Sequence, residues 1–222
     1  MVEDIALLWS GGKDSALALW ELTRAGAQRV RVLVTTVTEE YDRISMHGVR
    51  RPLLEAQVRS LGLSLLPVFI PARCTNDQYE KRMARTCEAL LRMGLRTIAS
   101  GDIFLEDVRH YREERLKAAG MQPLFPLWGR DSLELARTFI TAGFKAVTTC
   151  VDGQALGEQW AGREFDGEFL ADLPESRDPC GENGEFHTFV YAGPPFAQPI
   201  DWIRGETVLR DNRFYYCDLV PT

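Results

Sequence analysis

The chain has few of the features that define several large protein classes. Among its 222 residues are three histidines and five cysteines, with no C-x-x-C pair, so a structural zinc site or a disulfide framework is not expected. Acidic residues outnumber basic ones 32 to 26 and the pI is about 5.2, which argues against a nucleic-acid partner. No apolar run approaches the roughly 18–20 residues of a membrane span, and no secretory signal precedes the first strand. We expect a cytoplasmic protein with reduced thiols and no membrane partner.

The first half alternates between short apolar segments and segments with apolar residues at helical spacing. The short segments, several of them rich in β-branched residues, predict strands at 5–9, 31–37, 65–70, 97–101 and 123–128. The intervening segments predict helices at 13–25, 52–61 and 75–93. Because parallel strands need crossover connections, this order predicts an α/β fold with a doubly wound parallel sheet.

The pattern changes after residue 129. A helix is predicted at 131–142 and a strand at 145–151, followed by a stretch rich in Gly, Asp, Glu and Pro at 152–185. The remainder predicts strands, two of them joined by the turn-forming pair Asp211-Asn212. We therefore predict two domains, 1–128 and 129–222, the second a smaller mixed α+β unit.

The stretch "ALLWSGGKDSALALW" joins the first predicted strand to the first predicted helix. Its glycines permit a tight turn, and the helix N-terminus contributes unpaired N–H donors. A lysine in the first helical turn opposes the helix dipole, and an anionic ligand removes that objection. Strand, glycine turn, lysine and flanking hydroxyls predict a phosphate site, formed by Ser10, Gly11, Gly12, Lys13, Asp14 and Ser15.

The motif S-G-G-x-D-S is neither G-x-x-x-x-G-K-[ST] nor G-x-G-x-x-G. It resembles the pyrophosphate loop (PP-loop) of the ATP-pyrophosphatase superfamily, whose HUP-type fold is a doubly wound parallel sheet. The resemblance implies cleavage of ATP between its α and β phosphates, adenylation of a carbonyl or carboxylate oxygen, and displacement of AMP by a nucleophile. It also implies that residues 10–15 hold the pyrophosphate, with Mg²⁺ alongside.

A second motif, "DPCGENGEFHTFVYAGPPF" at 178–196, resembles the signature of the diphthine–ammonia ligase family. The segments "SGDI" at 100–103 and "PLWGRD" at 126–131 follow that family's order. The resemblance implies an amide-forming ligase that uses ATP and ammonia. The family's substrate is the carboxylate of a modified histidine in elongation factor 2. The segment "MHGVR" at 46–50 is similar to bacterial-type relatives, for which the acyl substrate is open.

The residues of this motif also suggest chemistry by themselves. Glu182 and Glu185 flank the turn-prone pair Asn183-Gly184, and His187 alternates with Glu185 on the following strand. Two carboxylates and a histidine can hold an ammonium ion and accept its proton. The alternative is a glycine-rich linker that leads into an ordinary strand.

Four further positions are candidate ligand contacts. Gly101 ends a predicted central strand and Asp102 follows it, at the edge where open α/β sheets bind ligands, so Asp102 is a tentative Mg²⁺ or phosphate ligand or a helix N-cap. Arg109 is a candidate phosphate contact oriented by Glu113. Thr35, at the end of the second strand, is a weaker candidate for the adenine site.

Two groups of residues have open roles. His47, Arg50 and Arg51 either receive an acidic substrate or lie at the surface. Cys180 lies beside the glutamates, but no base adjoins it in the sequence, so a nucleophilic role is not favoured.

Two other functions fit the same phosphate loop. A transfer-RNA-modifying enzyme would need a basic surface and commonly a cysteine pair, and the sequence shows neither clearly. A non-catalytic module that binds ATP or AMP would not need the two glutamates. The sequence leaves the oligomeric state open, with a homodimer among the possibilities.

Overall fold

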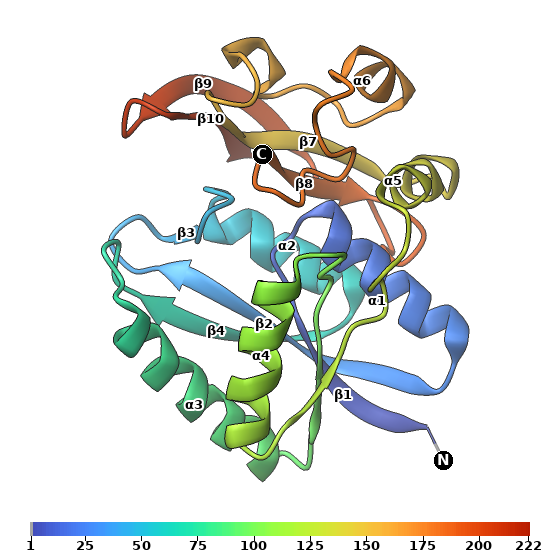
Figure 1. Ribbon diagram of the computed structural model, residues 1–222, viewed down its shortest axis with the longest axis vertical. Coiled ribbons are helices and arrows are strands. Elements are labelled where there is room, and N and C mark those ends of the chain that lie inside the picture. Colours follow the sequence, from blue (N-terminus) through green and yellow to red (C-terminus); the bar gives the residue numbers. More distant parts are fainter. Residues whose placement is uncertain (1) are drawn as a thin grey trace.

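The computed structural model describes residues 2–222 as two β-sheets with helices between and around them (Figure 1). Five strands of sheet A run parallel in the order β4-β2-β1-β5-β6. A short antiparallel strand, β3 (Arg43–Ile44), pairs with the end of β2. The five parallel strands are β1 (Glu3–Leu8), β2 (Gln28–Thr38), β4 (Ser64–Ile70), β5 (Thr97–Ala99) and β6 (Gln122–Leu124).

Helices cover both faces of sheet A. Helices α1 (Lys13–Ala25) and α2 (Arg51–Leu61) lie between the two sheets, and α3 (Asn76–Arg92) and α4 (Glu106–Ala118) lie on the opposite face (Figure 1). Strand β1 contributes buried side chains to both faces of sheet A because alternate side chains of a strand point to opposite faces. Ile5 and Leu7 belong to one buried cluster and Ala6 to the other.

Sheet B is antiparallel, with the order β8-β7-β10-β9. The turn between β9 and β10 has positive φ at Asp211 (52°) and Asn212 (49°), as a tight hairpin requires. Two short helices, η1 (Glu158–Trp160) and α6 (Gly167–Asp172), interrupt the segment after β7. The elements of this half are α5 (Ser132–Thr141), β7 (Lys145–Asp152), β8 (Phe186–Ala192), β9 (Trp202–Arg210) and β10 (Phe214–Pro221).

The structure differs from the sequence expectations at the ends of several predicted strands. The strand predicted at 123–128 spans only Gln122–Leu124, because β5 offers three residues to pair with and Pro126 has no N–H to extend the ladder. Strand β9 begins at Trp202, four residues before the β-rich segment "ETVLRD" at 206–211, for which the sequence predicts a strand. The predicted boundary near residue 129 stays a prediction, since one buried cluster joins residues of α1, α2 and sheet B. No helix within residues 2–222 is long and apolar enough to cross a membrane.

Candidate active site

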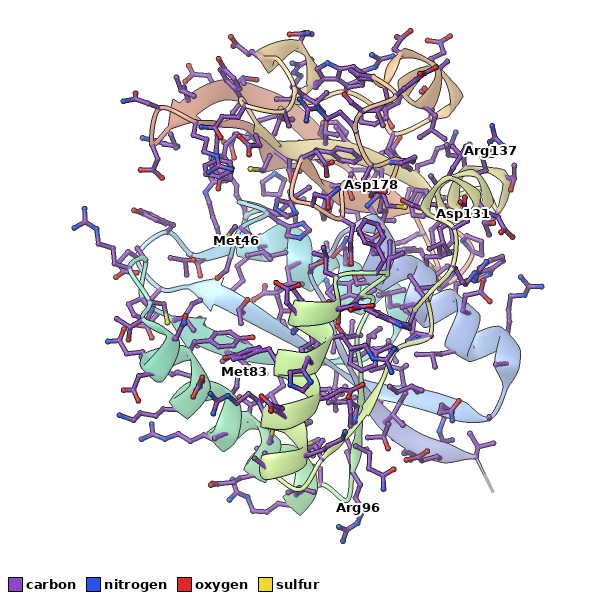
Figure 2. All side chains as sticks on the ribbon, in the orientation of Figure 1. Met46, Met83, Arg96, Asp131, Arg137 and Asp178 are labelled. Atoms are coloured by element: carbon purple, nitrogen blue, oxygen red, sulfur yellow. The ribbon has the colours of Figure 1, made fainter. Side chains whose placement is uncertain are left out.

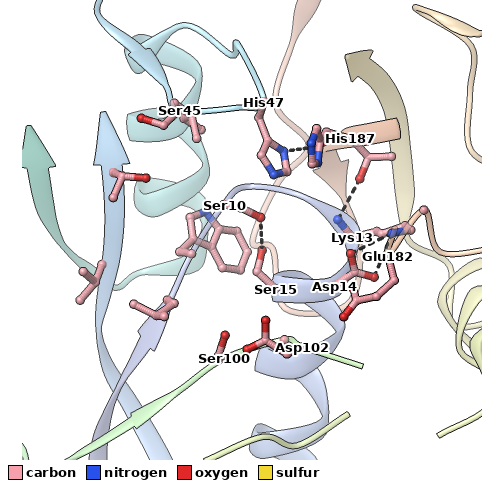
Figure 3. A pocket seen from close by; sticks show the side chains of 18 of the residues that line it. Ser10, Lys13, Asp14, Ser15, Ser45, His47, Ser100, Asp102, Glu182 and His187 are labelled. Atoms are coloured by element: carbon pink, nitrogen blue, oxygen red, sulfur yellow. Dashed lines mark hydrogen bonds and ion pairs between the residues drawn. The ribbon is translucent and has the colours of Figure 1, made fainter. Parts of the chain in front are cut away.

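A cavity of about 340 Å³ lies where the carboxyl ends of the central parallel strands meet the C-terminal half (Figure 3). Residues from both halves line it, so neither half forms the cavity alone. The polar side chains in its wall come from the glycine loop, the end of β2, the loop after β3, helices α3 and α4, the end of β5 and the segment 181–188: Ser10, Lys13, Asp14, Ser15, Thr36, Ser45, His47, Tyr79, Ser100, Asp102, Arg112, Glu182, His187 and Thr188.

The glycine loop is held in place by a fully buried glutamine of α2. The Gln57 amide nitrogen donates to the carbonyls of Gly11 (3.0 Å) and Val190 (2.6 Å), and its oxygen accepts from the Trp9 indole (3.0 Å). The Val190 N–H in turn donates to the Gly11 carbonyl (2.9 Å). The loop therefore lies clamped between α2 and the edge of β8.

Two glycines at the cavity are required by the protein's own packing. A Cβ on Gly12 would lie 2.8 Å from Cε1 of His47, and a Cβ on Gly101 would lie 2.9 Å from the backbone of Asp14. Real Cβ atoms do not approach other heavy atoms this closely. Glycine at these positions lets β5 and the loop after β3 approach the N-terminus of α1.

Lys13 begins α1 and is buried, and its charge has partners within the protein. Its Nζ lies 2.8 Å from Oδ2 of Asp14 and also donates to the carbonyl of Cys180. The Lys13 N–H donates to Oγ1 of Thr188 (3.0 Å), which satisfies one of the free N–H groups at the start of the helix. The sequence predicts an unfavourable interaction between the Lys13 charge and the helix dipole. The Asp14 carboxylate and the Cys180 carbonyl offset this interaction without any ligand.

Glu182 lies in the cavity wall close to this lysine (Figure 3). Its Oε1 accepts a hydrogen bond from the Ile103 N–H (2.8 Å), which links the C-terminal segment to the end of β5. Burial raises the Glu182 pKa to about 7, and the nearby Asp14 carboxylate adds to the rise. The carboxyl group therefore exchanges a proton near neutral pH, as a general acid or base must.

Glu185 and Asn183 are placed differently from Glu182, and neither lines the cavity. The buried Glu185 accepts from the backbone N–H of Asp178 (3.0 Å) and from the Asn183 side chain (3.1 Å) through Oε1, while its buried Oε2 makes no hydrogen bond. Asp178, in the segment that leads from α6 to β8 (Figure 2), accepts from the N–H groups of Cys180 and Glu182. These three side chains fold the loop that presents Glu182.

His187 lines the cavity and stacks against a second histidine. The rings of His187 and His47 have centroids 4.6 Å apart and are tilted by 36°. Phe186, His187 and Thr188 all border the cavity, and β7 has an irregular register opposite His187. Burial lowers the pKa of both imidazoles, that of His47 to about 4, so both rings are neutral at pH 7.

Asp102 also lies in the cavity wall, where Arg112 of α4 faces it at 2.9 Å. This contact joins Nε of Arg112 to the buried Oδ2 of Asp102 as an ion pair without hydrogen-bond geometry. Carboxylate oxygens suit a hard cation such as Mg²⁺, which would have to share the Asp102 carboxylate with Arg112. Within residues 2–222 there is no cluster of three or more His, Cys, Asp or Glu side chains arranged for a metal, and Mg²⁺ beside phosphates needs only one or two carboxylates.

Arg109 and Thr35 also lie outside the cavity lining, as do Gly11 and Gly12 of the glycine loop. Arg109 pairs with Glu113 (2.8 Å), as expected from the sequence, and its guanidinium covers the Trp128 ring at 4.5 Å. Thr35 is buried and donates to the Trp9 carbonyl (2.7 Å), whereas the next residue, Thr36, lines the cavity.

The remaining basic and thiol candidates have partners elsewhere. Arg50 pairs with Asp218 of β10, and Arg51 pairs with Asp42 and Glu55, so they form no free basic patch. The buried Cys180 thiol donates to the Ser132 carbonyl, and burial raises its pKa to about 12. Such a thiol is a poor nucleophile.

Sequence reasoning did not identify three residues that shape the cavity. Gln57 occurs in an ordinary amphipathic helix segment, and Thr188 closes the motif G-E-N-G-E-F-H-T without a role predicted for it; only the tertiary contacts reveal their partners. Arg112 belongs to the charge run "RHYREER", where the helical spacing alone did not distinguish it from Arg109.

The fold and the cavity together define an α/β protein with a ligand site at the carboxyl edge of a parallel sheet. Comparison with known families then identifies the family to which this α/β protein belongs. The diphthamide synthase N-terminal domain model matches residues 3–123, and the C-terminal domain model matches residues 131–218. The chain therefore belongs to the diphthamide synthase family, as the two sequence motifs predict.

Named relatives match along nearly the whole chain. The diphthine–ammonia ligases of Homo sapiens and Danio rerio are each 26% identical over 92% of this chain, covering 85% and 88% of their own lengths. The Bos taurus protein is 26% identical over 88% of this chain and 81% of its own length. A glycinamide ribonucleotide transformylase from Symbiobacterium toebii has 18% identity and a TM-score of 0.33, over 65% of this chain and 62% of its own, which is too low to support a parallel.

Proposed function

We propose that this protein is an ATP-dependent amide-forming ligase that adenylates a carboxyl group and transfers it to ammonia. The observation that carries the proposal is a single cavity bordered by both the S-G-G-K-D-S loop and the G-E-N-G-E-F-H-T segment. A non-catalytic nucleotide-binding module would not need an acid–base group of neutral pKa in the same cavity. The names of the relatives support diphthine as the acyl substrate where elongation factor 2 carries it.

Residues of the glycine loop would hold the phosphates of ATP. The hydroxyls of Ser10 and Ser15 lie 3.3 Å apart at the start of α1. The Ser15 hydroxyl donates to the Gly12 carbonyl (2.9 Å), so the Ser10 hydroxyl is the one that could donate to a phosphate. The helix N-terminus attracts an anion, and Lys13 supplies the adjacent positive charge. Asp102, with Asp14, would hold Mg²⁺, which neutralises phosphate charge when bound.

Glu182 is the residue that we assign to proton transfer in the second half of the reaction. As a carboxylate it accepts a proton from the nitrogen, and its pKa near neutrality lets it release that proton to solvent. Glu185 and Asn183 position it through the loop at 178–185.

Separating the two half-reactions tests this proposal. In Glu182→Gln we expect acyl-dependent exchange of pyrophosphate into ATP to persist, while ammonia-dependent amide formation falls by at least about a hundredfold. An Asp107→Asn variant, on the exposed first turn of α4, is the control for a lost carboxylate. Loss of ATP binding in Glu182→Gln would instead assign this carboxylate to the nucleotide site.

A further inference from the structure

His47 reaches the cavity on a loop that the C-terminal half holds in place. On either side of it, Arg43 and Arg50 pair with the carboxylate of Asp218 at 2.8 and 2.7 Å. A Cβ on Gly48 would lie 2.7 Å from the Tyr216 ring, so the loop packs tightly against β10. The imidazole consequently has a fixed position over Gly12 of the phosphate loop.

The hydrogen bond of His47 fixes its tautomer. Nδ1 lies 3.0 Å from the Thr188 carbonyl oxygen. A carbonyl only accepts, so Nδ1 carries the hydrogen, and in a neutral ring Nε2 is then a bare acceptor. Burial and the neighbouring Lys13 charge keep the ring neutral. Across residues 2–222, no protein group hydrogen-bonds to Nε2.

A bare acceptor in this cavity selects among the reactants of the proposed reaction. Phosphate and carboxylate oxygens are themselves acceptors and gain nothing from Nε2. The nitrogen nucleophile is the reactant that brings N–H donors. We infer that Nε2 of His47 binds ammonia through one of its N–H groups and accepts that proton as the nitrogen attacks the acyl carbon; this inference rests on the proposed function. His187, stacked on the ring, is a positioning residue.

The chemical step balances with His47 as the proton acceptor. The ammonia lone pair forms the new C–N bond at the acyl carbon. The bond from that carbon to the AMP oxygen breaks, and its electron pair leaves with AMP. As the lone pair is committed to the C–N bond, the nitrogen becomes strongly acidic, so one N–H proton can move to Nε2 despite the low pKa of the ring. The products are amide, AMP and imidazolium, which readily loses its proton to solvent. Glu182 serves the earlier deprotonation of ammonium to ammonia, so the two groups remove different protons.

Nitrogen NMR of protein with isotopically labelled histidine tests the binding site without any acyl substrate. We expect His47 to show a protonated Nδ1 and a bare Nε2, and ammonium chloride to shift the Nε2 signal. Potassium has a similar size but no N–H group, and tetramethylammonium has the charge but no N–H group, so neither should shift it. The exposed His110 is the internal control. A bare Nδ1, or equal shifts with potassium and ammonium, would overturn the assignment.

Two substitutions then separate binding of nitrogen from anchoring of the loop. Asn at position 47 keeps a donor for the Thr188 carbonyl but has no acceptor at the place of Nε2, whereas Ala loses both. We expect His47→Asn and His47→Ala to lose amide formation alike, by about a hundredfold, with pyrophosphate exchange within about threefold of wild type. His110→Asn is the matched control. Wild-type amide formation by His47→Asn would make His47 an anchor alone.

Hydroxylamine distinguishes failure of this inference from failure of the proposed function. It attacks acyl adenylates readily without a base, so its hydroxamate product reports whether the adenylate forms. Normal hydroxamate with little amide in His47→Asn supports the nitrogen site. Absence of exchange and hydroxamate in the wild-type protein would refute the proposed function, while the NMR result would still decide the ammonium site.

Discussion

Replacing Gln57 by leucine should damage ATP binding from a position that touches no ligand. The leucine is of similar size and keeps the apolar packing of α2, but it removes all three hydrogen bonds that fix the glycine loop. The carbonyls of Gly11 and Val190 and the indole N–H of Trp9 would each lose a buried partner.

The structure sets the scale of the stability loss. Each buried polar group left without a partner costs about 1 kcal/mol or more. The Gly11 carbonyl keeps the Val190 N–H as a partner, so Gln57→Leu should lower the free energy of unfolding by roughly 2 kcal/mol. For a chain of this size that loss corresponds to a fall in Tm of about 4–8 °C. With one of its two hydrogen bonds lost, the Gly11 carbonyl holds the loop less firmly, and we expect ATP affinity to fall by about tenfold or more.

The assay is calorimetric titration of ATP, at a temperature where both variants are folded. Ser60→Ala is the matched control because Ser60 lies on the same helix and also bonds the C-terminal half, at the Gln198 backbone, but not the loop. It should lose stability with unchanged ATP affinity. Tight ATP binding by Gln57→Leu, despite its lower Tm, would refute the claim that Gln57 sets the loop conformation.

Three further predictions concern charged groups. Lys13→Met should abolish ATP turnover and also lower the Tm, since Asp14 and the Cys180 carbonyl lose their partner; an unchanged melting curve would show these contacts to be unimportant. Glu182→Gln should be more stable than wild type by about 1–2 kcal/mol at pH 8 and equally stable below pH about 4.5. The reason is the raised pKa of Glu182: its ionisation lowers the stability of the wild-type protein increasingly between pH 4.5 and about 7. Equal stability of the two proteins in urea at pH 8 would contradict that pKa. Asp218→Asn should lose about 1–2 kcal/mol at pH 7, since its arginine partners lower the Asp218 pKa to about 2. That difference should fade as the pH falls from about 4 toward 2, and a difference independent of pH would indicate packing in place of charge.

Much of the fold could be predicted because its signals are local. Alternating apolar segments predicted the five parallel strands of sheet A and the helices α1, α2 and α3, and Asp211-Asn212 predicted the β9–β10 hairpin. The length of β6 could not be predicted, because it depends on its neighbour β5, which is itself only three residues long.

The features of the site likewise divide into those that local sequence motifs predict and those that depend on tertiary contacts. The glycine loop and Glu182 are motif residues, so the sequence predicts them, and the structure places both at one cavity. The different orientations of Glu182 and Glu185 could not be predicted, because both flank the same Asn-Gly turn and only the Asp178 backbone determines which carboxylate turns inward. The pairing of His47 with His187 joins positions 140 residues apart and depends on how the two halves dock.

The central claim, adenylation of a carboxyl group, has one direct test. An acyl substrate whose carboxylate carries a heavy-oxygen label would be incubated with the protein, ATP, Mg²⁺ and ammonium, and the nucleotide product analysed by mass spectrometry. The account predicts AMP that carries one labelled oxygen, because the acyl oxygen bonded to the α phosphorus leaves with AMP. ADP as the product, with the label in inorganic phosphate, would show an acyl phosphate intermediate and contradict the account.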